Sequence, residues 1–357
     1  MRVLYFGTYE RDYPRNAQVI SSLRGAGVEV VERHVGVWEG RRQTWSLGPG
    51  AALRLAAAEV RLLARPPGRF DAVVVGYPGH LDLPAAKWVA CGRPVVFNPL
   101  VSLSETLIED RGRFAAGSPA GRLLRWIDRS ALRRADLVVA DTAASARALA
   151  ELAGLPPERV KVCFVGAEER LFRPGWEQPA RFGALFVGKL IPLHGLATIL
   201  AAARLAPELP FTIVGSGQLD ALVASPPPNV ERVDWVDYER LPDRLRVAGC
   251  ALGIFGTSAK GQRVIPNKVF QALACGTPVV TADTPGAREL LRDGESALLV
   301  PPGDAHALAG ALRRLAGDAA LARQLGAGGR AAYLTHASEA VLGRRWRGLV
   351  EELVAGT

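Results

Sequence analysis

The residues best suited to chemistry follow a short apolar run in the second half of the chain. Gly188 and Lys189 come directly after Ala184–Val187, and His194 and Gly195 stand just before the next helical pattern. A lysine after a strand-end glycine can reach the phosphate of a leaving group, and a histidine at the rim can donate a hydrogen bond to it. Because a helix N-terminus presents unpaired N–H groups, this loop predicts a phosphate site. The alternative for His194 is a surface cap.

A longer segment, 256–276, gives the strongest local signal. A loop with glycine and serine is followed by Pro266, which stands where the first helical residue is expected, and Gly276 ends the helix. Such a helix aims its N-terminus, with about half a positive charge, at a ligand. We predict that a diphosphate binds there. Lys268 either adds positive charge to this site or points into solvent.

Two further glycine loops carry weaker signals. Gly215 and Ser216 lie in a VGSG loop, but the third glycine and the acidic residue of a nicotinamide site are missing. In the first half, Gly7 and Thr8 end the first apolar run with a single glycine, which argues against a dehydrogenase. We expect Gly7 to let a phosphate or a sugar approach the backbone.

Short β-branched runs alternate with amphipathic stretches along the whole chain, which predicts doubly wound α/β folding with parallel sheets. The expected strands span 2–7, 28–32, 71–76, 94–98, 136–140, 160–165, 184–188, 211–215, 230–235, 251–255, 278–282 and 297–300. The expected helices of the first half span 14–27, 50–64, 83–91, 120–134 and 142–153.

The rhythm breaks at 171–182, where two prolines interrupt an aperiodic stretch, and this segment predicts an interdomain linker. The expected organisation is two Rossmann-like domains, 1–172 and 183–337, facing each other across a ligand-binding cleft. A final helix within 338–357 is expected to cross back to the first domain.

Composition limits the remaining possibilities. The chain has 357 residues, 49% of them apolar and 22% charged, which is typical of a globular protein. No apolar run approaches the roughly 18 residues of a membrane span, and MRVLYFG does not resemble a secretory signal. Four scattered cysteines suggest buried free thiols rather than zinc ligands or disulfides. These features predict a cytoplasmic protein.

The formal net charge of +9 is concentrated in two arginine patches, at 41–69 and 111–134. Such patches can bind anionic lipid headgroups or a phosphorylated substrate, and the alternative is a solvated face. We therefore predict a peripheral position on the inner face of the plasma membrane. Nothing in the sequence resembles a nucleic-acid-binding module, so no nucleic-acid partner is expected.

Several segments between about 184 and 335 together resemble a known family. They are FVGKLIPLHGLATIL, the VGSG loop, IPNKVFQALACGTPVVTADTPGARELL and DGESALLVPPGD. They are similar, in this order, to the C-terminal domain of the retaining glycosyltransferases of family 4 (glycosyltransferase group 1), which have the GT-B fold. The first half is similar only in its architecture and in segments such as ADLVVADTAASARAL.

The resemblance implies a metal-independent reaction without a cofactor, in which a UDP- or GDP-type nucleotide sugar is the co-substrate. Lys189 matches the family's catalytic basic residue, and His194 takes the place of a second phosphate-binding lysine. The implied donor-binding residues are Gly7, Gly188, His194, Gly215, Ser216, Trp235, Pro266, Asn267, Lys268, Gln271 and Glu289.

This sequence also departs from the family. Two glutamates eight positions apart are replaced by Arg263 and Gln271. Gln271 can still hydrogen-bond a ribose hydroxyl, but Arg263 cannot accept a hydrogen bond from a sugar, so Glu289 is the candidate substitute.

The first domain is expected to bind the acceptor. His80 follows an apolar run and is the candidate for contact with a sugar hydroxyl at the reaction centre; the alternative is a loop histidine without a role. Asn98 stands where family members often have a histidine, and Arg111 lies in a nearby polar loop. We assign Asn98 and Arg111 to the acceptor.

The sequence therefore predicts sugar transfer, with retained anomeric configuration, to a hydroxyl of a glycan, a lipid-linked or a small-molecule acceptor. No carboxylate nucleophile is evident, which favours front-face attack with the leaving phosphate taking the acceptor proton. Two alternatives remain open: a non-catalytic glycosyltransferase-like binding subunit, and a nucleotide-sugar 2-epimerase of the same fold.

Overall fold

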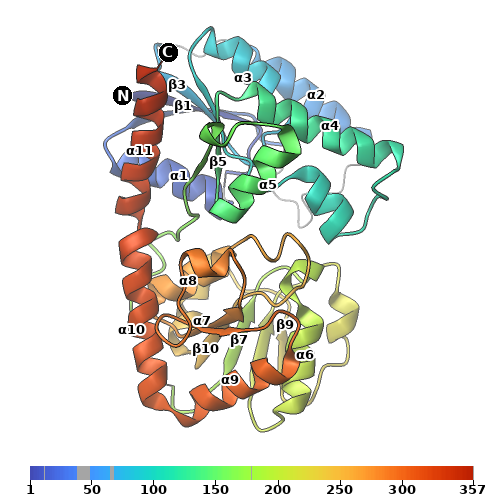
Figure 1. The fold of residues 1–357 in the computed structure, drawn as a ribbon, viewed down its shortest axis with the longest axis vertical. Coiled ribbons are helices and arrows are strands. Elements are labelled where there is room, and N and C mark those ends of the chain that lie inside the picture. The colour runs from blue at the N-terminus through green and yellow to red at the C-terminus, as the bar shows by residue number, and fades with distance from the viewer. Residues whose placement is uncertain (12, 38–48, 65–67, 178, 357) are drawn as a thin grey trace. The chain divides into compact units, whose positions relative to one another are not determined.

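The computed structural model describes residues 1–11, 13–37, 49–64, 68–177 and 179–356. The chain divides into two compact units (Figure 1). Unit 1 comprises Met1–Val165 and Glu339–Thr357, and unit 2 comprises Gly166–Ser338. Among the described helices, none combines the length and the apolar character that crossing a bilayer requires.

Unit 1 is built on a six-stranded parallel sheet of order β2-β1-β3-β4-β5-β6. The strands are β1 (Arg2–Gly7), β2 (Glu29–His34), β3 (Ala72–Val75), β4 (Val95–Phe97), β5 (Leu137–Ala140) and β6 (Val160–Val162). The helices are α1 (Pro14–Gly25), α2 (Pro49–Leu62), α3 (Leu83–Ala90), α4 (Pro119–Arg134), α5 (Ala143–Ala153) and α11 (Glu339–Ala355), with short turns η1 (Glu105–Asp110) and η2 (Pro157–Arg159).

Alternating residues of the same strands enter two different apolar cores. Val73 and Val75 of β3 pack with residues of α3, α4 and α5, whereas Ala72 and Val74 pack with residues of α1 and α11. Helices therefore cover both faces of the sheet, which is why its strands are nearly continuous apolar runs. Trp346 of α11 is buried in the second core.

Unit 2 repeats this plan with a parallel sheet of order β12-β11-β10-β7-β8-β9. The strands are β7 (Ala184–Val187), β8 (Phe211–Val214), β9 (Val230–Val233), β10 (Cys250–Leu252), β11 (Val279–Ala282) and β12 (Leu298–Val300). The helices are α6 (Leu196–Leu205), α7 (Leu241–Val247), α8 (Asn267–Cys275), α9 (Ala305–Gly317) and α10 (Ala319–His336), with η3 (Pro192–His194), η4 (Asp220–Val223), η5 (Tyr238–Arg240) and η6 (Ala287–Glu289).

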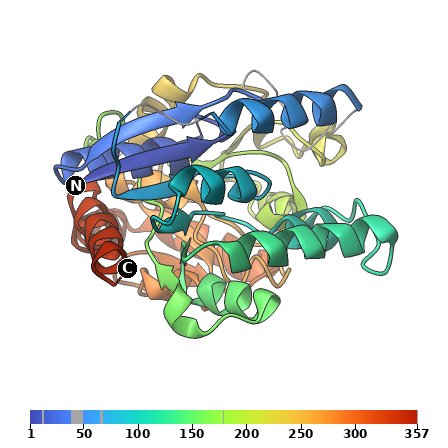
Figure 2. The ribbon, with the colours of Figure 1, turned by 90° about the horizontal axis from the view of Figure 1, so that it is seen from above.

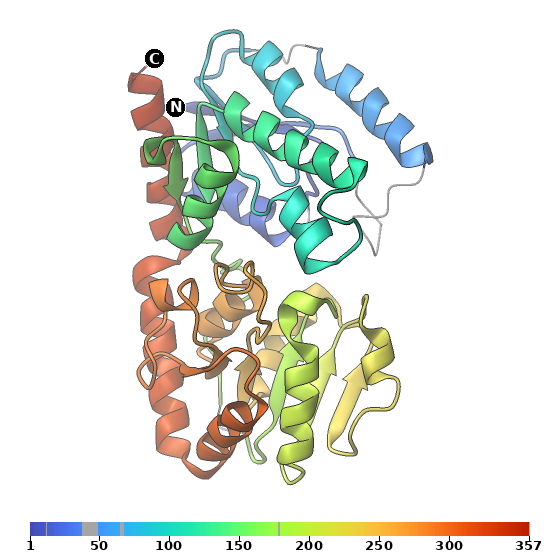
Figure 3. The same cartoon turned by 45° about the vertical axis from the view of Figure 1, so that its right-hand side comes forward.

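In unit 2, α6 packs on α9, and α8 packs on α7 and α10 (Figure 3). The segment before β7 has no regular structure, and it packs on unit 2 through Trp176, whose indole N–H donates to the Ala248 carbonyl at 2.8 Å. Each sheet changes its winding direction once, between β1 and β3 in unit 1 and between β7 and β10 in unit 2. Ligands bind beside such switch points, at the carboxyl ends of the strands.

The predicted fold class, two doubly wound α/β domains, is confirmed. The four cysteines are free thiols, as expected, but Cys91 is exposed rather than buried.

Candidate functional site

The loops after β7 and β8 are held together at the carboxyl edge of the second sheet. Leu190 N–H donates to the Ser216 carbonyl at 3.1 Å. Gly188 has a φ of +147°, and a side chain there would come within 2.8 Å of Lys268 Nζ, while one at Gly215 would meet the Gly188 carbonyl oxygen at 2.0 Å. Glycine at both positions therefore lets the two loops and the lysine lie in contact.

The ammonium group of Lys268 is the most unusual group at this edge. The side chain is buried, its Nζ lies 3.7 Å from the centre of the Phe186 ring, and Nζ has no hydrogen-bond partner among the described residues. Burial lowers the pKa of Lys268 well below its usual value. A buried cation without a counter-charge is destabilising, and an anion placed beside Nζ would provide that charge. The sequence left its orientation open, and the structure excludes the solvent-facing alternative.

His194 packs against the same aromatic ring. It is buried, its ring lies edge-on to Phe186 with centroids 5.5 Å apart, and its Nδ1 is 2.5 Å from the Lys189 carbonyl oxygen. Because a carbonyl only accepts, Nδ1 carries the proton in this contact, which fixes the orientation of the ring. His194 is therefore not a surface cap.

Helix α8 brings its N-terminus to this group of residues. Pro266 is the N-cap, in an extended conformation and without a capping side chain, so the helix begins at Asn267, one residue later than predicted. Lys268 is its second residue, and Gly276 ends it in a left-handed conformation with φ +77°. An uncapped helix N-terminus beside a buried cation attracts anions through both its N–H groups and its dipole.

The amide of Gln271, one turn further along α8, is directed at a tyrosine. Its Nε2 donates to the Tyr238 hydroxyl at 3.3 Å, and the Tyr238 ring stacks edge-on against Phe172 at 5.5 Å. Burial raises the pKa of Tyr238 above its usual value, so its hydroxyl stays protonated. The polar groups beside Gln271 thus include the hydroxyl of Tyr238, which the sequence did not suggest.

The loop after β11 lies against the loop that precedes α8. Gly286 N–H donates to the Gln262 carbonyl at 3.0 Å, and a side chain at Gly286 would meet the Arg263 carbonyl oxygen at 2.3 Å. Glu289 follows in η6 and is half-buried. Gly286 is therefore a close neighbour of Arg263, and the role of Glu289 as a substitute stays a prediction.

Three other predicted donor-site residues follow the strands but face solvent. Lys189 and Ser216 are exposed directly after β7 and β8, and Trp235 is 70% exposed just after β9. Their roles stay predictions.

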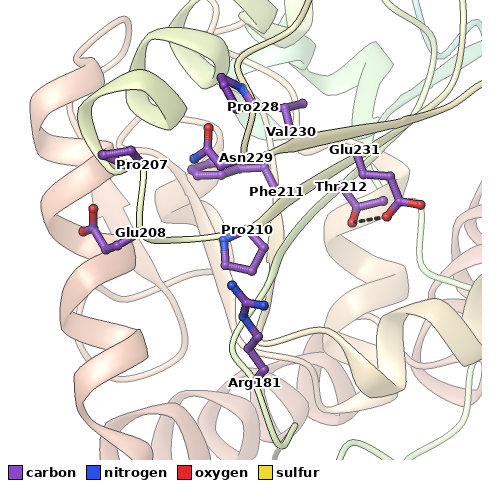
Figure 4. Close-up of a pocket in the computed structure, with 10 residues that line it drawn as sticks. All are labelled: Arg181, Pro207, Glu208, Pro210, Phe211, Thr212, Pro228, Asn229, Val230 and Glu231. Carbon is purple, nitrogen blue, oxygen red and sulfur yellow. Dashed lines mark hydrogen bonds between the residues drawn. The ribbon is translucent and has the colours of Figure 1, made fainter.

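A cavity of about 330 Å³ lies at the opposite edge of the same sheet (Figure 4). It surrounds the first residues of β8 and β9, and it is lined by Arg181, Pro207, Glu208, Pro210, Phe211, Thr212, Pro228, Asn229, Val230 and Glu231. Asn229 is committed to structure, because its Nδ2 donates to the carbonyls of Ala203, Ala206 and Leu209 at the end of α6. None of the predicted site residues lines this cavity.

In unit 1 a buried carboxylate occupies the space beside Gly7. Gly7 has a φ of +129°, and a side chain there would come within 2.1 Å of Asp82 Oδ2. Thr8 donates to the same carboxylate through its N–H at 2.7 Å and through Oγ1 at 3.0 Å. The loop after β1 is therefore filled by Asp82, and the predicted approach of a ligand to Gly7 stays untested.

Asp82 also shares a hydrogen bond with Glu59 of α2. Burial and this hydrogen bond raise the pKa of Glu59 to about 10, and burial raises the pKa of Asp82 as well. Ionising both of two close carboxyl groups costs free energy, because the two negative charges repel each other, so the pair holds a proton at neutral pH.

This shared proton makes the stability of unit 1 depend on pH. Glu59 is protonated in the folded chain up to about pH 10 but ionises near pH 4.5 in the unfolded chain. The contribution of protonated Glu59 to the free energy of unfolding is therefore complete below pH 4.5, and it is lost as the pH rises through the folded-state pKa. We expect Glu59→Gln to melt at a higher temperature than the natural protein at about pH 9, with a smaller difference at about pH 5. The control Glu151→Gln, exposed on α5, should behave as the natural protein at both values; a Glu59→Gln difference that is equal at the two pH values would contradict the shared proton.

His80 is enclosed in the core of unit 1. Its Nδ1 hydrogen-bonds the Pro78 carbonyl, its Nε2 lies 3.4 Å from Asp128 Oδ1, and its ring is edge-on to Phe97. Burial lowers the pKa of His80, and the Asp128 carboxylate opposes this shift. Only 2% of the side chain is exposed, so contact with an acceptor hydroxyl would require this arrangement to open.

The predicted acceptor residues Asn98 and Arg111 differ in their surroundings. Asn98 is fully buried and accepts a hydrogen bond from Arg15 Nε at 2.9 Å. Arg15 also donates to the carbonyls of Cys163 and Phe164, at 3.0 and 2.7 Å. Arg111 is half-buried at the end of η1. Asn98 therefore has a clear structural function, and the acceptor roles of both residues stay predictions.

Four polar side chains whose hydrogen bonds organise unit 1 were not suggested as such by the sequence: Arg15, Glu59, Asp82 and Asp128. Asp128 and Glu59 each left a weak signal, because each is the single acidic residue of an arginine-rich segment. The others depend on partners far away in the chain.

The chain matches two family models. Residues 2–166 match the model described as glycosyl transferase 4-like domain, and residues 181–318 match glycosyl transferases group 1. It is 30% identical over 361 residues to a D-inositol 3-phosphate glycosyltransferase of Thermomonospora curvata, covering 89% of this chain and 78% of that protein. A protein with the same description from Acidothermus cellulolyticus is 31% identical, over 61% of this chain and 54% of its own length.

Solved structures of similar fold include two of full length. Sucrose-phosphate synthase from Thermosynechococcus elongatus superposes with a TM-score of 0.76 at 17% identity, covering 100% of this chain and 99% of that chain. Anabaena HepE, solved with UDP-glucose, gives 0.69 at 17% identity, with coverage of 99% and 100%. These neighbours support the fold alone, whereas the family models and the curated relatives show that the chain belongs to the group 1, family 4-like glycosyltransferases of GT-B fold, which use nucleotide-sugar donors.

Proposed function

We propose that the chain transfers a sugar, with retained configuration and without a metal ion, from a nucleoside-diphosphate donor bound by unit 2 to a hydroxyl of an acceptor bound by unit 1. The observation that carries this proposal is the buried, unpaired ammonium of Lys268 beneath Gly188, at the uncapped N-terminus of α8. A diphosphate is the ligand whose charge suits this site.

The proposed chemistry is electrostatic. Breaking the bond between sugar and phosphate leaves negative charge on the diphosphate, and donors already aimed at that charge stabilise the transition state more than the ground state. Lys189 acts on the leaving phosphate from the loop after β7. His194 acts on it as the imidazolium, which donates through Nε2 while Nδ1 stays bonded to the Lys189 carbonyl. Lys268 acts with Asn267 from α8. The leaving phosphate takes the proton of the acceptor hydroxyl.

UDP is the first donor nucleotide to test, because HepE of similar fold is solved with UDP-glucose. For the nucleoside, we propose contacts with Gln271 and stacking on exposed Trp235, whose ring is open to a base. For the acceptor, D-inositol 3-phosphate is the first compound to test, given the description of the curated relatives. His80, Asn98 and Arg111 are the proposed acceptor residues.

The proposal is tested by binding and transfer together. UDP or UDP-glucose should stabilise the protein against heat, by about 2.7 kcal/mol at 100 times its dissociation constant. Free UDP should appear only when an acceptor is present. Lys189→Ala should fold normally and lower turnover by about two orders of magnitude, the effect of a lost donor to a developing charge.

Each alternative has its own result. Nucleotide binding without release of UDP from UDP-glucose in the presence of any acceptor would indicate a binding subunit, and a changed sugar without an acceptor would indicate an epimerase. Unchanged turnover in Lys189→Ala would remove this residue from the mechanism. Failure of UDP, GDP and ADP to bind would end the proposal.

A further inference from the structure

The outer face of α4 in unit 1 combines strong positive charge with exposed apolar side chains. Helix α4 spans Pro119–Arg134 and buries Gly121, Asp128, Ala131 and Leu132 against the unit. The residues exposed on it are Pro119, Arg122, Leu123, Trp126, Arg129, Arg133 and Arg134. These fall three, four and seven positions apart, so they lie along one side of the helix.

In the part of the chain that the structure describes, no carboxylate forms an ion pair with the arginines of this face. The only acidic residue of α4 is Asp128, and its carboxylate is buried, accepting hydrogen bonds from Ser102 and from the N–H groups of Leu103 and Ser104 at 2.8–2.9 Å. Among the described residues, Arg122, Arg129 and Arg133 make no salt bridge with a carboxylate. Two of them donate instead to backbone carbonyls at the end of α5.

The apolar side chains distinguish this face from an ordinary solvated one. Trp126 is 63% exposed and Leu123 is 55% exposed, three positions apart and flanked by arginines. Phe114, in the loop that leads into α4, is 41% exposed. Solvation explains exposed arginines, but a tryptophan and a leucine side by side in water lose the free energy that burial would supply.

The position of α4 leaves this face accessible. α4 packs on α3 and α5, and it lies on the outside of unit 1 (Figure 2). Its inner face is held by the contacts of Asp128, while Arg129 and Arg133 on the outer face also bond to the end of α5. Five of the seven arginines predicted at 111–134 lie on α4, whereas most of the patch at 41–69 lies outside the described residues or on α2.

We propose that the outer face of α4, with Phe114, docks on the surface of an anionic lipid bilayer. The arginines bind lipid phosphates, while Trp126, Leu123 and Phe114 enter the boundary between headgroups and acyl chains, as in interfacial amphipathic helices. Charge selects the partner, because an uncompensated cationic face with apolar side chains between the arginines matches a negative, partly apolar surface. Docking of α4 on a bilayer is separate from sugar transfer and does not depend on which donor unit 2 binds.

Vesicle co-sedimentation with the full-length protein tests the proposal. The protein should bind vesicles that contain phosphatidylglycerol, should not bind pure phosphatidylcholine, and should bind less as salt is added. Arg122→Glu/Arg129→Glu/Arg133→Glu should weaken binding on the order of 100-fold, because each basic residue near the surface contributes several-fold. Leu123→Ala/Trp126→Ala should weaken binding about tenfold or more at constant charge.

Matched controls lie on unit 2. Arg314→Glu on α9 and Leu334→Ala on α10, both exposed, should bind as the natural protein does. An unchanged thermal unfolding curve of the α4 variants without ligand would show that unit 1 still folds. Loss of vesicle binding with UDP binding intact separates lipid docking from the proposed function.

Three results would overturn the proposal. One is absence of binding to anionic vesicles at low salt. Another is binding that the α4 variants leave unchanged. The third is loss of binding in the arginine variant but none in Leu123→Ala/Trp126→Ala, which would mean plain charge attraction, equally available to a nucleic acid, instead of insertion by this face.

Discussion

Replacing Lys268 with methionine is expected to weaken UDP binding on the order of 100-fold while raising the melting temperature of the ligand-free protein. Methionine has a similar length and can pack on the Phe186 ring, but it removes the ammonium that lies over that ring and that the diphosphate would pair with. Such a loss costs about 2–5 kcal/mol of binding free energy. The same change spares the folded chain an unpaired buried ammonium. Calorimetric titration with UDP and thermal melting of the apo protein measure the two effects.

The effect of Lys268→Met on the melting temperature should depend on pH. Since burial depresses the pKa of Lys268, the unfolded chain holds a proton that the folded chain lacks between the lowered pKa and the usual value near 10.5. The contribution of the uncharged Lys268 side chain to the free energy of unfolding is therefore present above the unfolded-state pKa of Lys268. This contribution is lost as the pH falls through the folded-state pKa. Lys268→Met should lack this loss, and the advantage in melting temperature should grow as the pH falls through that window.

Binding should also draw a proton into the site. A diphosphate beside Nζ favours the charged ammonium, so the natural protein should take up a proton with UDP, seen as a binding enthalpy that changes with the ionisation enthalpy of the buffer. Lys161→Met, on β6 of unit 1, should leave both UDP affinity and proton uptake unchanged. Unaltered UDP affinity in Lys268→Met would show that no diphosphate lies beside this lysine.

Removing the carboxylate of Asp128 is expected to destabilise unit 1 by about 3–5 kcal/mol. The fully buried carboxylate accepts from Ser102 Oγ and from the N–H groups of Leu103 and Ser104, and these donors would be left unpaired in Asp128→Ala. The loss also frees the segment that leads into η1. Chemical denaturation, followed by a probe in unit 1, measures the difference.

Two variants control this experiment. Asp128→Asn keeps one acceptor oxygen and should lose less stability than Asp128→Ala. Glu351→Ala removes a half-exposed ion pair with Arg347 on α11 and should cost no more than about 1 kcal/mol. If Asp128→Ala cost no more than Glu351→Ala, the carboxylate would not be organising the loop after β4.

The architecture was predictable from the sequence because its strands are locally encoded. Four- to six-residue runs such as AVVV in β3 have to be buried on both faces, and this requirement already implies helices on both sides. Strand ends were less predictable. The expected strand 251–255 is Cys250–Leu252 in the structure, because beyond Leu252 the ladder is continued partly by the Thr281 side chain, which accepts from Ile254 N–H at 3.2 Å.

The donor site was predictable in its parts but not in its electrostatics. Gly188 and the start of α8 could be placed from local patterns, whereas the orientation of Lys268 depends on packing against Phe186, which belongs to β7, about 80 positions earlier. In unit 1 the decisive partners are distant in sequence. Thr8 bonds Asp82 and Arg15 bonds Asn98 across more than 70 positions, and no periodicity signals such pairs.

The return of α11 to unit 1 makes unit 2 an insert within unit 1. Leu342, Trp346, Leu349 and Val350 complete a core that α1 begins more than 300 positions earlier, so unit 1 is assembled from two ends of the chain. A ribosome therefore releases unit 2 complete before unit 1 has received its last helix. Shortening the C-terminus would damage the N-terminal unit, and a fragment that starts at Gly166 and stops at Ser338 is the only one of the two units that can be excised as a single uninterrupted piece.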